Sequence, residues 1–400
     1  MRGWSFALRS LVRQPGRSAL GVLGVAAIGA LLLDMLLLSR GLVLSFRNLL
    51  DSAGFDVRVL AGEDLPLAAP RLTQATPAVA AIAALPEVDE VVPLRFGEAS
   101  ATGADGRPLK IHVTGVDPGR RRPWVLLEGR DLAAAGPGLP GLVVNRNLAT
   151  ALRLAPGAEA VLGVRCTANA ADFLPAHFRV AGIVEFPFDE ATELTAATRL
   201  AAFRGACGLE DRDEADLLLV ASRERHGAAA AVTAIRGLRP DLHAFSNAQL
   251  VARFEQVGFS YFRQISSVLS CVTLFFGFLL ISVLLTVSVH QRLAEIAALR
   301  ALGLSARRVS QDLLCQSVLL VGSGGALSVP LGLVLARWLD AILREMPQIP
   351  ASVHFFVLEP RALAIHAGLL GTTALLAALY PMRLVARLPI AATLRNEVIS

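Results

Sequence analysis

The sequence is poor in lysine and in charged residues altogether. Only one of its 38 basic residues is a lysine, Lys110, and Asp, Glu, Lys and Arg together make up 18% of the 400 residues. An ATP-binding P-loop needs a Gly-rich turn followed by lysine, whereas Lys110 follows Pro108 and Leu109. The chain is therefore expected to lack ATPase activity of its own and to show it only with a partner subunit.

Recognisable catalytic and metal-binding motifs are missing from the sequence as well. Its seven histidines are scattered, and none belongs to a His-x-x-x-His or His-Glu-x-x-His pair. No Gly-x-Ser-x-Gly sequence of a serine hydrolase is present. We therefore predict no catalytic, cofactor-binding or metal-binding residue in this chain.

Long apolar runs are what the sequence has in abundance. Hydrophobic residues make up 54% of the chain and its mean hydropathy is +0.56, whereas a soluble protein carries roughly 25% charged residues. About 20 consecutive apolar residues can cross a bilayer as a helix. Four segments of this kind predict four membrane spans: Ala19–Leu38, Val268–Val289, Leu313–Ala336 and Ala362–Met382. The first is too long for the apolar core of a signal peptide, about 7–15 residues, and is expected to be a retained anchor.

Two of the predicted spans contain an ionisable residue. Asp34 lies four residues before the end of the first span, where we expect its side chain to reach towards water or to pair near Arg40. His366 lies near the outer end of the fourth span, and a role in a proton path is the less favoured reading of it.

Arginine placement predicts the orientation in the membrane. Arginines gather before the first span, between the second and third, and after the fourth, whereas the stretch between the third and fourth is balanced. Because positive residues flank the cytoplasmic side, both termini are expected in the cytoplasm and Ser45–Gly258 outside. That outer segment has 22 basic and 26 acidic residues (net −4), and the rest has 16 and 7 (net +9). The high pI therefore does not indicate nucleic-acid binding.

The predicted fold class is an α-helical membrane protein with four transmembrane helices and a large α+β extracytoplasmic domain between the first two. Its segments are a cytoplasmic amphipathic helix (1–18), the first span and the start of a stalk (19–44), the outer domain (45–258), a stalk and second span (259–289), a cytoplasmic coupling helix (290–312), the third span (313–339), a short outer loop (340–361), the fourth span (362–382) and a cytoplasmic tail (383–400).

The outer domain is predicted to mix strands and helices. Short β-branched runs bounded by Gly, Pro or Asp predict strands at Phe55–Leu60, Glu90–Phe96, Leu109–Val116, Gly141–Asn145, His177–Glu185 and Ala215–Ala221. Helices are predicted at Thr76–Leu85, Asn147–Leu154, Thr195–Ala206 and Glu224–Leu238, with Asn147 and Thr195 as N-caps.

Apolar residues continue at helical spacing past both junctions with the membrane. These two stripes are Leu42, Phe46, Leu49 and Leu50 after the first span, and Leu250, Phe254, Val257, Tyr261 and Ile265 before the second. Either both spans run on as rigid helices that form a stalk, or these residues simply pack into the outer domain.

The cysteines differ by compartment. Cys271 and Cys315 lie in or beside spans and are expected to be packing residues. Cys166 and Cys207 lie in the outer domain, where an oxidising environment would allow a disulfide between them. The sequence alone does not decide whether this disulfide forms. The basic run Arg120–Arg122 is expected to lie in a solvated loop. The alternative is that it contacts lipid headgroups or an anionic partner.

The third span has small residues at every fourth position. Gly324, Ser328 and Gly332 would let two helix backbones approach closely in lipid. Pro330 between them is expected to kink the helix. Packing within the chain and contact with a second subunit are both open readings of this pattern.

The strongest local pattern follows the second span. Residues His290–Val309 predict a short amphipathic helix that Gly303 ends or bends and after which Ser305 caps the next turn. On the inner face of a membrane protein such a helix is a docking surface for a soluble partner; the alternative is a helix resting on lipid. The residues assigned to docking are Arg292, Glu295, Leu299, Arg300, Gly303 and Arg307.

This segment also resembles a known family. Residues Glu295–Gly303 are similar to the segment after the second span of the MacB/FtsX-like permeases, the membrane subunits of type VII ABC transporters. The ending, with Tyr380–Pro381 and Leu394–Glu397, and the start, Ala7–Leu11, resemble the C- and N-terminal signatures of that family. Val113–Asp117 is one of several similar phrases in the outer domain, so the resemblance covers the whole chain.

The resemblance implies a dimer in the cytoplasmic (inner) membrane, formed with a second copy of this permease or a paralogue. It also implies a separate dimer of cytoplasmic ATP-binding subunits, which hold ATP and Mg and dock on the coupling helix. It implies mechanotransmission, in which ATP-driven closing on the inner side moves the outer domains. Lipoprotein-releasing and DevC-like permeases are similar, which implies export or extraction of a lipid-linked or amphiphilic substrate such as lipoprotein, lipid or peptide, with a periplasmic adaptor or carrier as a further partner.

Two alternatives belong to other functional classes. The first is an FtsX-like regulatory permease that activates an extracytoplasmic enzyme, such as a cell-wall hydrolase, without transporting a substrate. The second, more distant, is a membrane-anchored receptor with no ATPase. An outer segment of Ser45–Gly258 favours transport weakly, because the outer domains of FtsX-type regulators tend to be smaller.

Overall fold

The computed structural model describes residues 15–63, 70–103, 106–117, 119–132, 138–165, 173–257, 260–291, 296, 305–344, 346 and 350–386. The chain divides into two compact units. The helical unit comprises Met1–Val43, Gly258–Leu343 and His354–Ser400, and the α+β unit comprises Leu44–Val257 and Arg344–Val353.

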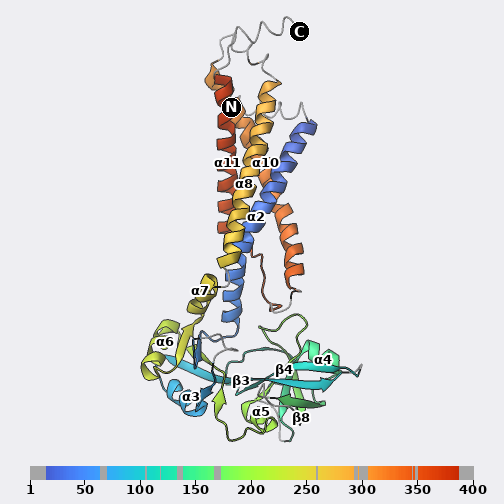
Figure 1. The fold of residues 1–400 in the computed structure, drawn as a ribbon, viewed down its shortest axis with the longest axis vertical. Coiled ribbons are helices and arrows are strands. Elements are labelled where there is room, and N and C mark those ends of the chain that lie inside the picture. The colour runs from blue at the N-terminus through green and yellow to red at the C-terminus, as the bar shows by residue number, and fades with distance from the viewer. Residues whose placement is uncertain are drawn as a thin grey trace. The chain divides into compact units, whose positions relative to one another are not determined.

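Four helices make up the described part of the helical unit: α2 (Pro15–Ser52), α8 (Ser260–His290), α10 (Ala306–Arg344) and α11 (Pro360–Ala386) (Figure 1). Each is long and apolar enough to cross a membrane. The four spans expected from the sequence are thus confirmed as apolar helices. α2 is the most enclosed by its neighbours, with half of its apolar window buried, whereas 17% of the α8 window is buried.

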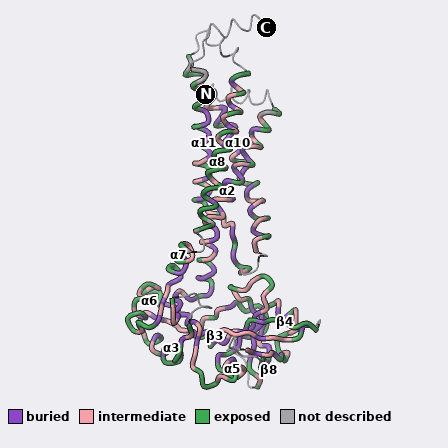
Figure 2. The backbone as a smooth tube through the Cα atoms, viewed as in Figure 1, coloured by how far each residue is buried: buried purple, intermediate pink, exposed green. Residues whose placement is uncertain are grey.

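The apolar residues of these helices point both inward and outward. Val25, Leu32, Ile281 and Ala377 belong to a cluster buried between the helices. Large apolar side chains such as Phe276, at 58% exposure, lie on the outside, and Figure 2 shows exposed positions along α8. A helix that is apolar on both sides suits a lipid environment better than water.

The α+β unit is built on a ten-stranded sheet in the order β12-β1-β11-β3-β4-β9-β6-β8-β5, with β7 paired to both β3 and β8. The strands are β1 (Val57–Leu60), β3 (Val88–Thr102), β4 (Pro108–Val116), β5 (Val125–Gly129), β6 (Gly141–Asn145), β7 (Glu159–Arg165), β8 (Leu174–Glu185), β9 (Thr195–Arg199), β11 (Leu217–Ser222) and β12 (His243–Ser246). A small separate sheet pairs β2 (Leu72–Thr73) with β10 (Glu214–Ala215).

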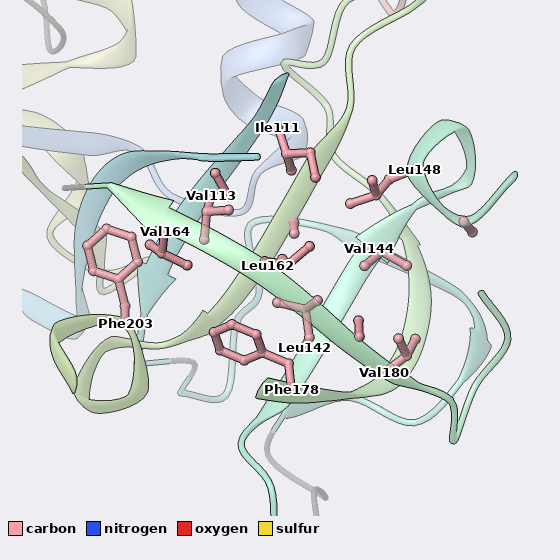
Figure 3. Packing of buried hydrophobic residues seen from close by; sticks show 14 of the residues in the cluster. Ile111, Val113, Leu142, Val144, Leu148, Leu162, Val164, Phe178, Val180 and Phe203 are labelled. Atoms are coloured by element: carbon pink, nitrogen blue, oxygen red, sulfur yellow. The ribbon is translucent and has the colours of Figure 1, made fainter. Parts of the chain in front are cut away.

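Six of these strands close into a ring. The pairings run from β3 through β4, β9, β6, β8 and β7 and return to β3. Inward-facing residues such as Leu142, Leu162 and Phe178 fill the ring (Figure 3). Phe203 of α5 (Leu200–Ala206) packs where Gly115 leaves room, because a Cβ there would lie 2.7 Å from the Phe203 side chain. The ring therefore has a closed apolar core.

The other end of the sheet is covered by helices. α3 (Ala75–Ala83) and α6 (Gly227–Leu238) contribute Ile82 and Ile235 to a second apolar cluster with residues of β1 and β11. α4 (Arg146–Leu152) and α7 (Asn247–Val257) complete the helices of this unit.

The expected elements differ from the observed ones in definite places. The segment Thr195–Ala206 is not one helix: Thr195–Arg199 is strand β9, and only Leu200–Ala206 is helical. Alanine and threonine at 195–198 are buried between β4 and β6, and this pairing overrides their helix propensity. The N-cap of α4 is Asn145, whose Oδ1 accepts from the Leu148 N–H, and not Asn147. Strands β5, β7 and β12 were not anticipated.

Candidate functional site at the ends of the connecting helices

Two helices carry the chain into and out of the α+β unit. α2 crosses the boundary between Val43 and Leu44 and continues unbroken to Ser52, and α7 ends at Val257, where the unit ends. Phe46 of α2 and Phe254 of α7 meet edge to face, with ring centroids 4.7 Å apart. The expected helical continuation of the first span is thus confirmed. The second stripe is packed only in part, because Tyr261 and Ile265 are 69% and 61% exposed.

One buried amide joins both helices to the sheet. Asn247, the first residue of α7, is 6% exposed. Its Nδ2 donates to Oδ1 of Asp51 in the last turn of α2 at 2.8 Å and to the Phe55 carbonyl at 3.1 Å. Its Oδ1 accepts from Nη1 of Arg58 in β1, and its backbone N–H donates to the Asp56 carbonyl at 2.9 Å. The end of α2, the start of α7 and strand β1 therefore share one set of hydrogen bonds, which we call the Asn247 clasp.

Arg58 extends this clasp across the unit. Its side chain is 5% exposed, and desolvation lowers the pKa of the guanidinium to about 10, opposed by the charges of Asp51 and Asp56. The guanidinium carbon also lies 5.9 Å from the centre of the Phe188 ring, within cation–π range. Phe188 belongs to the loop that follows β8, so Arg58 connects the clasp to that loop.

The same loop holds a segment that comes from between α10 and α11. Residues 350–353, here called the strap, belong to the α+β unit. Pro350 forms a β-bridge with Glu190, and the Ala351 N–H donates to the Asp189 carbonyl at 2.8 Å. Oγ of Ser352 donates to the Pro187 carbonyl at 2.5 Å. The clasp, Arg58, the 187–190 loop and the strap form one continuous set of contacts.

A pocket of about 370 Å³ lies beside the strap, lined among others by Leu127, Glu185, Asp189 and Ser352. Burial raises the pKa of Asp189 to about 7, with smaller increases from the Glu193 and Glu185 charges, opposed by the hydrogen bond from Asn145. Nδ2 of Asn145 donates to Asp189 Oδ2 at 2.7 Å. The charge beside the strap therefore changes near neutral pH.

In the helical unit the small residues of α10 pack against α2. A Cβ added at Gly324 would lie 2.7 Å from Cβ of Val25, and one added at Gly29 would lie 2.7 Å from Cβ of Ser328. A Cβ at Gly332 would lie 3.1 Å from the Leu33 side chain. The small residues at every fourth position of α10 therefore pack closely against residues at every fourth position of α2. This close packing is within one chain. Pro330 is exposed and lies inside α10, which continues on both sides of it.

The ionisable residues of the spans lie inside the helical unit. The prediction that Asp34 reaches water is wrong, because its exposure is 0%. It does not pair near Arg40 either, since Nη1 of Arg40 bonds Oε2 of Glu359 at 3.4 Å. The exposure of His366 is 2%, and its Nε2 lies 3.0 Å from Oγ of Ser328. A carboxyl at this depth was expected to avoid burial, but helices pack around it on every side.

Most residues assigned to partner docking lie outside the described part of the chain. These are Arg292, Glu295, Leu299, Arg300 and Gly303, and residues 1–14 and 387–400 lie outside it too. Arg307 is described and is exposed in the first turn of α10. The docking assignment stays a prediction.

The remaining candidates have plain structural environments. Cys207 is disulfide-bonded, and Cys166 lies outside the described residues, so their pairing stays a prediction. Cys271 and Cys315 are free thiols. The basic run Arg120–Arg122 makes ion pairs within the chain, with Asp89 and Asp131. Where the structure describes the chain, no group of three His, Cys, Asp or Glu residues is placed to hold a metal ion.

Sequence reasoning did not identify Asn247, Arg58 or the strap. Asn247 had one available signal, a helix-capping residue type directly before an amphipathic stretch. Arg58 stands among apolar residues of a predicted strand, which is unusual for a charge. Nothing in the sequence of residues 350–353 indicates which loop they contact.

Comparison with known proteins gives one family match. Residues 267–390 match the family model described as "FtsX-like permease C-terminal". No curated protein matches the chain. Among solved structures, the periplasmic region of MacB from Actinobacillus actinomycetemcomitans is 11% identical, with a TM-score of 0.37 over 52% of this chain and 98% of that chain. The extracellular domain of the noncanonic ABC-type transporter YknZ from Gram-positive bacteria is 10% identical, with a TM-score of 0.33 over 48% and 99%. Both TM-scores are below 0.5, so neither likeness establishes a shared fold.

Proposed function

We propose that this chain is an FtsX-like permease, on the basis of the family match over residues 267–390. As such, the chain is the membrane subunit of an ABC-type transporter in the cytoplasmic membrane. A separate ATP-binding subunit binds ATP and Mg and supplies the energy. The permease converts that energy into movement of its α+β unit, which lies on the outer side with both termini in the cytoplasm.

The observation that carries this proposal is the length and attachment of α2. The helix has 38 residues, about 57 Å at 1.5 Å per residue, whereas a bilayer core is about 30 Å thick. Its last turn is bonded to the α+β unit through the Asn247 clasp. An unbroken helix transmits rotation or tilt along its length, whereas a flexible linker would absorb it.

The strap adds a second attachment of the α+β unit to the chain between α10 and α11. Since Ala351 and Ser352 bond the 187–190 loop, and Arg58 connects that loop to Asn247, movement of either attachment acts on the same region of the sheet. Packed contacts with few alternative arrangements transmit displacement between sites. This arrangement supports mechanotransmission.

We assign the docking of the ATP-binding subunit to residues 290–312. Glu295→Ala or Arg300→Ala is expected to leave membrane insertion intact but to weaken association with that subunit, because breaking a buried charge pair costs roughly 2–5 kcal/mol. Gly303→Val is expected to act similarly through backbone geometry. If all three variants bind and work like the parent, the segment rests on lipid and docking occurs elsewhere, such as the 383–400 tail.

The proposed substrate is lipid-linked or amphiphilic, such as a lipoprotein, lipid or peptide. Apolar side chains including Leu32, Ile281 and Leu370 form a buried cluster between the helices of one chain. This cluster favours handling of the substrate by the α+β unit at the outer surface over passage of a polar substrate between the helices.

Purification from the native membrane tests the proposal. The chain is expected to co-purify in mild detergent with an ATP-binding protein, and the complex, but not the chain alone, is expected to hydrolyse ATP. A verified pure chain that hydrolyses ATP, or a chain that never co-purifies with an ATPase, contradicts the proposal.

A further inference from the structure

The helical unit contains two buried ionisable side chains that the proposed function does not use. Asp34 of α2 and His366 of α11 have exposures of 0% and 2%. Among the residues that the structure describes, both oxygens of Asp34 and Nδ1 of His366 are buried without a hydrogen-bond partner. Buried polar atoms are nearly always paired in native proteins, and ionisable residues within spans mark functional sites by default.

The hydrogen bonds of Ser328 decide which kind of partner His366 lacks. The Ser328 hydroxyl donates its one hydrogen to the Gly325 carbonyl at 2.7 Å. Its oxygen can therefore only accept from Nε2 of His366, 3.0 Å away. A neutral imidazole with its hydrogen on Nε2 has a lone pair on Nδ1. His366 thus presents a buried acceptor that lacks a donor.

The register of the helices places Asp34 within about one and a half helical turns of this acceptor. A Cβ at Gly29 of α2 would lie 3.5 Å from the Leu370 side chain of α11. Four residues further along α2 and four residues back along α11 are Leu33 and His366, and each step of four rises about 6 Å. Beyond them, Leu37 and Ala362 belong to one apolar cluster. Asp34 follows Leu33 directly, whereas Nε2 of His366 lies beside Ser328, which packs on Gly29. The carboxyl and the imidazole therefore lie within about one and a half turns of α2 from each other along the bundle.

We infer that Asp34 and His366 are the two halves of a hydrogen-bonded pair that forms in a second packing of the helices. A protonated Asp34 carboxyl donates to Nδ1 of His366; the shared proton stays on the oxygen or moves to the nitrogen, and no proton enters or leaves. In the packing described here each group is unsatisfied, which raises its free energy relative to the paired state. The inference rests on the proposed function in one respect, that ATP binding by the partner subunit drives the change of packing.

Substitutions separate this pair from a merely tolerated buried residue. Asp34→Asn keeps a donor for Nδ1, whereas Asp34→Leu removes it. ATP turnover by the complex in nanodiscs is expected to stay near the parental rate with Asp34→Asn and to fall about 3- to 20-fold with Asp34→Leu, the range expected for hydrogen bonds between membrane helices. Thr373→Val is the matched control, because its buried hydroxyl bonds the Leu369 carbonyl of its own helix; we expect near-parental turnover. If Asp34→Asn and Asp34→Leu have the same turnover, the pair does not form.

A cross-link tests the second packing directly. Asp34→Cys and His366→Cys are combined in a chain whose free Cys271 and Cys315 are replaced by alanine, and oxidation is followed in inverted membrane vesicles. The disulfide is expected to form at least about threefold faster with ATP and vanadate than without nucleotide. A fluorescent label on the α+β unit reports the nucleotide response independently. If that label responds and the cross-link does not, the pair is refuted while the proposed function stands. If neither responds, both are refuted.

Discussion

Replacing Asn247 by alanine tests whether the clasp holds the connecting helices to the sheet. The change removes the acceptor of the buried Arg58 guanidinium and the donor of the buried Phe55 carbonyl. A hydrogen bond to a charged group is worth about 1.5–3 kcal/mol and a neutral one about 1 kcal/mol, and the charges of Asp51 and Asp56 still act on Arg58 after the change. We therefore expect the α+β unit to lose about 3 kcal/mol of unfolding free energy. At about 2–4 °C per kcal/mol for a domain of this size, its Tm falls by roughly 6–12 °C.

Thermal unfolding of the full chain in nanodiscs measures this loss. Fluorescence of Trp124, which is 5% exposed in the α+β unit, reports the transition. Asn147→Ala is the matched control, because its amide donates at 3.0 and 3.1 Å to two backbone carbonyls, which are neutral; about 1 kcal/mol is expected. If the Asn247 variant melts no lower than the Asn147 variant, the clasp does not fasten the helices and the reasoning from buried hydrogen bonds is refuted.

Three further predictions concern other parts of the chain. Gly324→Ala should destabilise the helical unit by about 1–3 kcal/mol in thermal unfolding, and Gly322→Ala should not, because no atom of the described residues lies within 4 Å of a Cβ there; equal effects would contradict the α2–α10 packing. Asp189 has a folded pKa of about 7, above its unfolded value, so its stabilising contribution is complete below about pH 4 and is lost as pH rises through 7; unfolding free energy should fall by about 3 kcal/mol between pH 5 and 8, and Asp189→Asn should abolish that fall. A cysteine at exposed Arg225 should react with an impermeant reagent in intact cells and one at exposed Arg307 should not; the reverse result would invert the topology.

The sequence was sufficient for the features that depend on length and periodicity. Four apolar runs of about 20 residues have few structural solutions other than spanning helices, and alternating or β-branched runs located strands such as β4 and β6. Edges and junctions were less predictable. Thr195–Arg199 is strand β9 because it pairs with β4 and β6, and intrinsic propensity does not include the effect of neighbouring strands.

The candidate site depends on contacts between residues far apart in the sequence. Asn247 meets Asp51 across 196 positions and Arg58 across 189, and no local pattern encodes such a meeting. Asp34 shows the same limit: its position near a span end favoured an exposed carboxyl, whereas the packing of α2 against its neighbours enclosed it. Small residues at every fourth position predicted close packing of α10 correctly, but only the three-dimensional structure identifies α2 as its partner.

The most direct test of the central claim is a distance between the two units in two nucleotide states. Spin labels at exposed Arg225 in the α+β unit and exposed Val334 in α10 are compared in the complex with its ATP-binding subunit, without nucleotide and trapped with ATP and vanadate. We expect the distance distribution to shift on trapping and Asn247→Ala to reduce the shift while ATP hydrolysis continues. An identical distribution in both states, in a complex that hydrolyses ATP, would contradict this expectation.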